Sequence, residues 1–124
     1  MKQSLYKKLG GANKIKTMVD DIVDAHLDNS VIRARFLPYL ERPEYVDQVK
    51  QHMCDLLGMG AGGPEKYKGR NMETTHEGMN INEEEFVAAL DDILMVLQNH
   101  EISNEAQNEV LGMLYSMKDE IVRQ

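Results

Sequence analysis

Apolar residues recur at helical spacing along the whole chain, and this periodicity constrains the fold more than any other feature of the sequence. Between residues 12 and 28 they return at every third or fourth position. Apolar and polar residues nowhere alternate over enough positions to indicate a β-strand, so the sequence predicts an all-α protein. The apolar stripe of this first long helix consists of Ile15, Met18, Val19, Ile22 and His26.

Proline and glycine mark where the next two helices begin and end. The second long helix is predicted to begin at Pro43, because the first turn of a helix tolerates a missing N–H, and to end at Gly58. After the glycine-rich stretch 58–63, a short helix of about two turns runs to His76, and Gly78 stops it. The buried side of the second long helix is predicted to carry Tyr45, Val46, Val49, Met53, Leu56 and Leu57.

Two further long helices are predicted in the C-terminal third of the chain. Asn82 followed by Glu85 is typical of a capping box, and the helix that it opens, over 83–97, has the most regular apolar stripe of the chain. The last helix runs from about Glu105 to Val122. The two apolar stripes consist of Phe86, Val87, Leu90, Ile93, Leu94 and Leu97, and of Ala106, Val110, Leu114, Met117 and Ile121.

Length and charge limit the class of partner. The chain is expected to form a single domain, residues 1–124, with one hydrophobic core. Its formal net charge is −7 and its basic residues are scattered, so neither a nucleic acid nor an anionic membrane is expected as the main partner. No apolar run approaches the roughly 20 residues of a membrane span. The single cysteine, Cys54, and the polar start without a signal-peptide core indicate a cytoplasmic protein.

Histidine is the commonest metal-binding side chain, and the chain has four of them. His52 and His76 lie on two separate predicted helices joined by a glycine-rich turn, among methionine and aliphatic residues. Two histidines on two separate helices are the arrangement that would hold a flat, apolar ligand with a central metal. Taken alone, His76 is equally well explained as a core histidine. His26, on an apolar stripe, is the structural competitor, and His100 suits the dipole at the end of its helix. The spacings match neither a zinc site nor a di-iron site.

Two stretches carry a resemblance to a known family. Residues 5–11 read LYKKLGG, and residues 62–86 hold a second, more specific series of residues in a fixed order and spacing. Together they resemble the pattern of the group I truncated haemoglobins over nearly the whole chain. The resemblance implies a two-over-two helical sandwich around haem b, with His76 as the proximal iron ligand. The second series is Gly62, Gly63, Pro64, Tyr67, Gly69, Arg70, Met72, His76, Met79, Ile81 and Phe86.

The distal side departs from the family pattern. The family's Phe-Tyr pair, whose tyrosine donates a hydrogen bond to bound oxygen, reads Ile22-Val23 here, and its distal glutamine falls at Val49. His52, which lies 24 residues before His76, falls where bis-histidine members carry their second iron ligand. The resemblance therefore implies a hexacoordinate haem with both histidines on the iron. His26 stays open as a rival distal ligand.

The same resemblance assigns the remaining contacts of the haem. Lys50, Lys68 and Arg70 are candidates to meet the propionates, although each is equally well explained as a solvated surface charge. Nine further residues, together with Ile93, are expected against the macrocycle, and some of them fit a plain protein core as well. The nine are Val49, Met53, Leu56, Tyr67, Met72, Met79, Ile81, Phe86 and Leu90.

The function that the resemblance implies is reversible binding of diatomic ligands (O₂, NO and CO) at the iron, gated by departure of His52. Detoxification of nitric oxide to nitrate, with an external reductase restoring ferrous iron, is the candidate chemistry. A bis-histidine electron-transfer haem protein is the alternative. A monomer is expected, and Met117 lies near the position where some relatives carry a histidine bonded covalently to the haem, so no such cross-link is expected.

Overall fold

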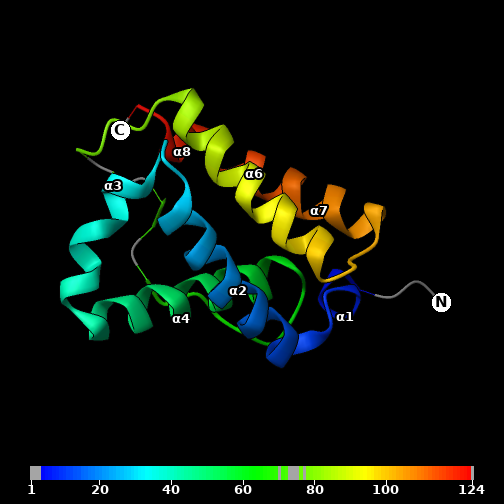
Figure 1. Cartoon of the computed structure of the whole chain (residues 1–124). Helices are drawn as coiled ribbons and strands as arrows, with labels where there is room; N and C mark the ends of the chain where they lie inside the picture. Colours follow the sequence, from blue (N-terminus) through cyan, green and yellow to red (C-terminus); the bar gives the residue numbers. More distant parts are fainter. Residues whose placement is uncertain (1–3, 70, 73–75, 77, 124) are drawn as a thin grey trace.

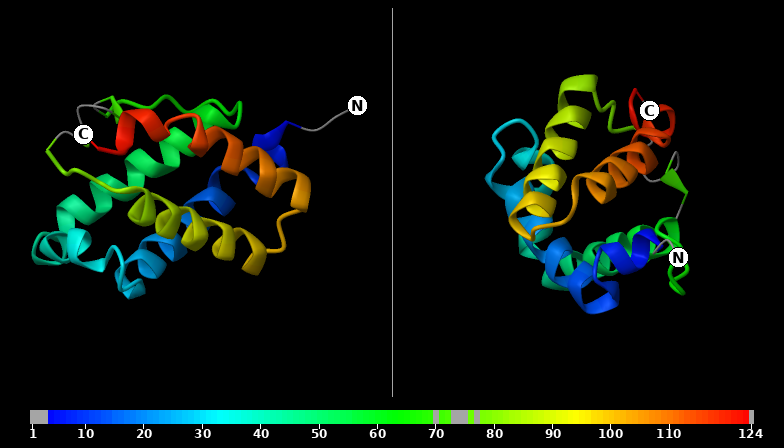
Figure 2. Two further views of the ribbon diagram at one scale, coloured as in Figure 1. Left: turned by 90° about the horizontal axis from the view of Figure 1, so that it is seen from above. Right: turned by 90° about the vertical axis from the view of Figure 1, so that its right-hand side faces the viewer.

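Two pairs of helices form the fold in the computed structural model, which describes residues 4–69, 71–72, 76 and 78–123 (Figure 1). Helix α2 (Gly11–Asp28) packs against α4 (Pro43–Gly60), and α6 (Glu83–Asn99) packs against α7 (Asn104–Tyr115). Contacts between α2 and α6 join the two pairs, and Figure 2 shows the pairs crossing from two further sides. This arrangement confirms the predicted all-α fold and the two-over-two sandwich.

Short elements connect the long helices and extend the chain at both ends. Helix α1 (Leu5–Lys8) precedes α2, whereas α3 (Arg33–Phe36) and the 3₁₀ helix η1 (Leu37–Glu41) make the corner between α2 and α4. Helix α8 (Lys118–Ile121) follows α7. Within the described part of the chain the only β-type pairing is an isolated parallel bridge between Ile81 and Val122. The Arg123 N–H reinforces this bridge by donating to the Ile81 carbonyl at 2.8 Å.

The main core lies where α2 meets the pair α6–α7. All five residues of the predicted α2 stripe are buried, which confirms that stripe. The stripe predicted on α6 is wrong at Val87, which is 44% exposed, and Leu94 is only half-buried. The other residues of that stripe are buried, and so is a second row of α6 at four-residue spacing. This second row consists of Ala88, Asp92 and Val96.

The helix caps explain where the predicted boundaries hold and where they fail. The capping box is present, since Asn82 Oδ1 accepts from the Glu85 N–H at 2.8 Å and Glu85 Oε1 accepts from the Asn82 N–H at 3.3 Å. Helix α4 continues two residues past Gly58, because the C-cap Ala61 still donates to the Leu57 carbonyl at 2.9 Å.

The prediction of one continuous helix to Val122 is wrong. Helix α7 ends at Tyr115, and α8 begins only at Lys118. The Ser116 hydroxyl donates to the Met113 carbonyl at 2.5 Å, and a serine side chain that takes such a carbonyl competes with helix propagation.

The apolar side of α4 is covered less than the sequence predicts. Tyr45 is 40% exposed, so its predicted burial is wrong. The other five apolar residues are half-buried, and among the residues of α4 only Gly58 is buried. A helix whose apolar face the protein covers only in part is the kind that borders a binding site. The half-buried residues are Val46, Val49, Met53, Leu56 and Leu57.

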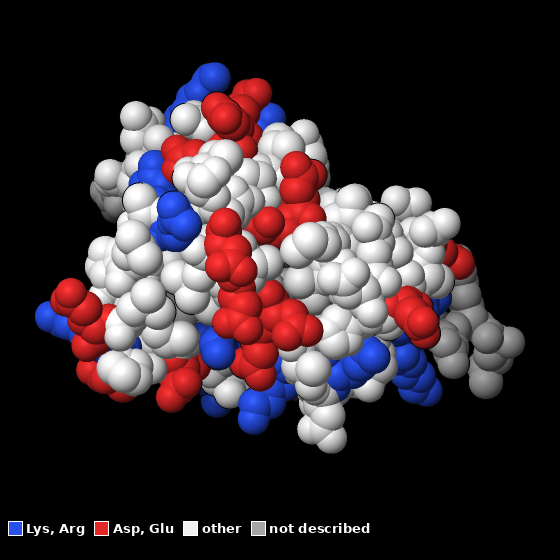
Figure 3. Space-filling view, viewed as in Figure 1, with Lys and Arg blue, Asp and Glu red and all other residues white. Residues whose placement is uncertain are grey.

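The surface reflects the acidic composition. On the face shown in Figure 3, Asp and Glu side chains gather along the middle, and Lys and Arg side chains lie mainly toward the margins. Over the described residues, no helix combines the length and the apolar character needed to cross a membrane.

Candidate functional site

A hydrogen bond within its own turn orients the ring of His76. Its Nδ1 lies 2.7 Å from the carbonyl oxygen of Met72, and a carbonyl only accepts, so Nδ1 carries the proton. The neutral ring then keeps a lone pair on Nε2, the atom that a metal would use. Both residues are helical and half-buried, whereas residues 73–75 of the predicted short helix lie outside the described residues.

The backbone forms a turn at residues 78 and 79. Gly78 has a φ of 81°, in the left-handed region that favours glycine, which is the conformation typical of a residue that follows a helix. The Met79 N–H donates to the His76 carbonyl at 3.1 Å. The chain then reaches Ile81, where the bridge to Val122 fixes it to the C-terminal segment.

His52 lies on α4, and its ring meets the ring of Tyr67 in an edge-to-face arrangement. The ring centroids are 5.7 Å apart and the planes are inclined by 70°. The Nδ1 of His52 is buried and has no hydrogen-bond partner in the described part of the structure. A buried polar atom without a partner is costly, so packing alone does not account for the position of this nitrogen.

Gly69 makes room for Tyr67. A Cβ atom at residue 69 would lie 2.4 Å from the Tyr67 hydroxyl oxygen, which is far closer than real Cβ contacts. With any other residue at position 69, the Tyr67 ring that flanks His52 would have to shift. This contact gives a physical reason for the Tyr67–Gly69 spacing in the second sequence motif.

An open cavity of about 600 Å³, lined by residues with polar side chains, lies between α4 and the segment 65–68. His52 and the exposed Lys68 both line it, so the structure brings these two predicted site residues together. Lys50 instead pairs with Asp20 of α2 at 3.2 Å, and Arg70 lies outside the described residues. The lining consists of Gln48, Gln51, His52, Asp55, Glu65, Lys66 and Lys68.

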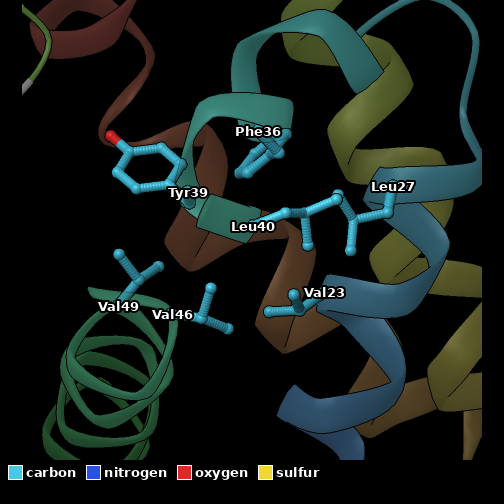
Figure 4. Close-up of a pocket in the computed structure, with 7 residues that line it drawn as sticks. All are labelled: Val23, Leu27, Phe36, Tyr39, Leu40, Val46 and Val49. Carbon is cyan, nitrogen blue, oxygen red and sulfur yellow. The ribbon is translucent and has the colours of Figure 1, made fainter. Parts of the chain in front are cut away.

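A second, apolar cavity of about 20 Å³ lies between α2, the corner formed by α3 and η1, and α4 (Figure 4). Val23 and Val49 face it, at the two positions where the family pattern has tyrosine and glutamine. The Tyr39 hydroxyl points away from the other six side chains, so among the described residues no lining side chain directs a hydrogen-bond donor into this space. The lining consists of Val23, Leu27, Phe36, Tyr39, Leu40, Val46 and Val49.

His26 is engaged elsewhere. Its Nδ1 lies 2.7 Å from Asp92 Oδ2, its ring stacks on Phe36 with centroids 5.2 Å apart, and only 4% of its surface is exposed. Burial disfavours the charged imidazolium and lowers the pKa of His26, while Asp92 acts in the opposite direction. His100, at the end of α6, likewise binds a carboxylate, with its Nε2 2.7 Å from Asp21 Oδ2.

The sequence patterns did not identify Asp92 as the partner of His26, or Asn29 as the second partner of Asp92. The side-chain nitrogen of Asn29 lies 3.1 Å from both carboxylate oxygens of Asp92. One signal was available. Asp92 stands four residues from both Ala88 and Val96, so it belongs to a second inward-facing row of α6. A carboxylate in such a row requires donors from the facing helix.

The remaining predicted contact residues fall into two groups. Ile81, Phe86 and Leu90 are buried together, with Met79 packed against them, so this cluster lies next in sequence to His76. Ile93 belongs to the main core, and Met53 packs against that core from α4. Leu56 on α4 and Met72 are half-buried.

Comparison with known proteins gives consistent similarities. Residues 4–123 match the family model of the bacterial-like globins. A group 1 truncated haemoglobin of Tetrahymena pyriformis is 30% identical over 118 residues, which are 94% of this chain and 93% of that protein. A group 1 truncated haemoglobin of Synechocystis sp. is 31% identical over 116 residues, 89% of this chain and 88% of that protein. The crystal structure of the truncated haemoglobin from Tetrahymena pyriformis, Fe(III) form, matches with a TM-score of 0.89 and 26% identity, covering 98% of this chain and 100% of that one.

Proposed function

Since this chain belongs to the bacterial-like globins and to the group 1 truncated haemoglobins, a family that implies a haem cofactor, we propose that His76 and His52 bind the iron of a haem b. Departure of His52 from the iron admits diatomic ligands. The bound haem supplies an iron centre at which O₂, NO or CO is taken up reversibly. The protein residues hold the haem, set the orientation of the two rings and control access.

The observation that carries the proposal is the hydrogen bond between His76 Nδ1 and the Met72 carbonyl, 2.7 Å long. It fixes the tautomer in which Nε2 has the lone pair, and it raises the basicity of the ring. Metal-binding histidines in proteins almost always make such a bond through their other nitrogen. The residues present therefore fit an iron ligand at His76.

His52 is the better second ligand of the two candidates. Its Nδ1 is buried without a partner in the described part of the chain, whereas the Nδ1 of His26 binds Asp92 at 2.7 Å. His26 is only 4% exposed and its ring stacks on Phe36, so protein already covers it and it is less accessible to an iron. His52 is half-buried, and since its Nδ1 has no hydrogen bond among the described residues, turning the ring toward an iron would break none at that atom.

The apolar cavity beside Val23 and Val49 determines what meets an incoming ligand. These valines offer no hydrogen bond, so His52, once it has left the iron, is the side chain proposed to donate to the ligand. An internal ligand also lowers affinity. If His52 occupies the iron about 99% of the time, the apparent affinity for CO or O₂ falls about a hundredfold.

Apolar residues on both sides complete the proposed haem site. Lys68 and Arg70 are proposed to meet the propionates. On the His76 side, Met72, Met79, Ile81, Phe86 and Leu90 provide the contacts, and on the His52 side Val49, Met53, Leu56 and Tyr67 do so. The half-buried state of the α4 members supports this assignment, because protein alone covers only part of their surface.

Absorption spectroscopy of the haem-loaded protein tests the proposal. Ferric and dithionite-reduced spectra are recorded before and after CO is added. Low-spin bands in both ligand-free states, displaced rapidly by CO, are expected. A five-coordinate or water-bound spectrum would leave His76 alone on the iron and contradict the role of His52. Low-spin bands that CO displaces only very slowly would favour the electron-transfer alternative.

Oxidation of nitric oxide to nitrate is the finer activity proposed for the site. It requires O₂ and an external reductase that returns the iron to the ferrous state. The measurement is the yield of nitrate per nitric oxide consumed by the reduced, oxygen-exposed protein. A yield near that of free haem under the same conditions would contradict this activity without affecting the proposed ligands.

A further inference from the structure

The hydrogen-bonded pair formed by His26 and Asp92 has no part in the proposed function, although it is the most deeply buried polar pair described. Asp92 is 9% exposed and His26 is 4% exposed. The pair joins α2 to α6 across 66 positions of sequence. Asn29, at the C-cap of α2, donates to the same carboxylate at 3.1 Å. A buried carboxylate with these donors is held in one orientation, and so is the imidazole ring that binds it.

The face of the His26 ring lies against Phe36. The centroids are 5.2 Å apart and the planes are inclined by 26°, which is a stacked arrangement. Phe36 in turn lines the apolar cavity with Val23 and Val49, and Figure 4 shows its ring directed toward that space. His26 therefore contacts the wall of the cavity from behind.

The residue before Phe36 is also anchored to α6. The Arg35 guanidinium forms a two-point ion pair with Glu85, and one of its two bonds, from Nη2 to Oε1, is 3.0 Å long. Glu85 itself belongs to the capping box of α6. Arg35 thus holds helix α3 to α6. The next side chain, Phe36, stacks on the ring of His26.

We propose that His26 is a positioning residue of the ligand-entry side: fixed by Asp92 and Asn29, its ring holds Phe36 in place, and Phe36 sets the shape of the apolar cavity. The inference deepens the proposed function, because the cavity controls ligand entry only if a haem lies beside Val49. The neutral state of His26 suits this role. Burial lowers its pKa, and a neutral ring both donates to Asp92 and stacks on an apolar partner.

The test uses the haem-loaded protein and two variants. Asp92→Asn removes the charge that orients His26, and His26→Gln keeps a donor for Asp92 but removes the stacking ring. His100→Gln is the matched control, since His100 also joins α6 to α2 through a carboxylate, that of Asp21. After photolysis of the CO complex, both test variants should change the CO rebinding rate by about threefold or more, an effect of the size found for coupling through packed side chains. The His100→Gln control should leave the CO rebinding rate unchanged.

A double-mutant cycle separates positioning from general loosening. If His26 acts through Phe36, Asp92→Asn should have no further effect on CO rebinding in a Phe36→Leu background. Equal effects of Asp92→Asn in both backgrounds would overturn the proposal. If Asp92→Asn fails to fold, the same cycle with His26→Gln decides.

A second readout needs no gas. The ring resonances of Phe36 in nuclear magnetic resonance spectra should show faster ring flipping in Asp92→Asn and His26→Gln than in the parent or the His100→Gln control. Unchanged Phe36 resonances would overturn the positioning role even if the parent protein took up no CO. Failure of the parent to take up haem or CO would instead overturn the proposed function.

Discussion

The Tyr6 hydroxyl donates a hydrogen bond of 2.7 Å to Glu65 Oε1, joining residues 59 positions apart. The backbone makes a second link, since the Tyr6 N–H donates to the Ala61 carbonyl at 2.9 Å. The two sequence motifs, around Tyr6 and around Gly62, are therefore parts of one contact. This contact anchors the beginning of the segment that continues through Tyr67 to His76.

Gly63 should be the least replaceable residue of that contact. A Cβ atom there would lie 2.3 Å from the Tyr6 ring and 2.6 Å from Glu65 Oε2. Gly63→Ala is therefore expected to lower the free energy of unfolding by about 1–3 kcal/mol, measured by urea denaturation. Gly112→Ala is the matched control. No neighbouring atom lies within 4 Å of a Cβ at this helical position, so up to about 1 kcal/mol of stabilisation is expected. Equal stabilities for the two variants would show that the Tyr6 contact does not constrain residue 63.

Replacing His76 by glycine should remove the proximal ligand. The His76→Gly protein is expected to lose the low-spin spectrum, and added imidazole should restore it by occupying the space of the missing ring. The absorption spectrum before and after imidazole is the measurement. His100→Gln should keep the parent spectrum, because its ring binds Asp21. A parent-like spectrum in His76→Gly without imidazole would exclude His76 as a ligand.

Replacing His52 by alanine should open the sixth coordination position. The ferric spectrum of His52→Ala is expected to change from low-spin to water-bound or five-coordinate, and the apparent CO affinity should rise by up to about a hundredfold. His26→Ala is the informative comparison, since His26 is the rival ligand. If that substitution, and not His52→Ala, changes the coordination state, the assignment of the distal ligand is wrong.

The stability of the protein should fall in mildly acidic solution because of His26. Burial holds the pKa of His26 below its value in the unfolded chain, so the unfolded state binds the proton more readily. The contribution is complete above about pH 6.5 and is lost as pH falls toward the folded-state pKa, with a slope of at most about 1.4 kcal/mol per pH unit. Urea unfolding at several pH values measures it. His26→Gln should flatten this pH dependence relative to the parent, and an unchanged slope in that variant would assign the effect to another group.

Local features of this fold were predictable from the sequence, whereas features that depend on partners far along the chain were not. The α2 stripe and the Asn82–Glu85 capping box each depend only on residues close to one another along the chain, and both are present. The His26–Asp92 pair spans 66 positions, and although helical spacing places Asp92 in an inward-facing row of α6, it does not identify His26 as the partner.

The wrong predictions have a related cause. An apolar stripe indicates which face of a helix is buried, but the extent of burial depends on what covers it, and Tyr45 and Val87 lie where nothing described covers them fully. The break after Tyr115 coincides with a side-chain hydrogen bond of Ser116 to the Met113 carbonyl, a local feature that leaves no trace in the apolar pattern. The roles of His52 and His76 on iron, the single domain, the monomer and the cytoplasmic location stay predictions.

The bridge between Ile81 and Val122 connects the C-terminal segment directly to the segment that follows His76. The Arg123 N–H holds the Ile81 carbonyl at 2.8 Å, and Ile81 lies five residues after His76. Force applied through a tether at this end would act, through the bridge, on the segment that follows the histidine. Attachment there offers a way to pull on the proximal side deliberately, and it is the end to leave unmodified when native coordination is to be measured.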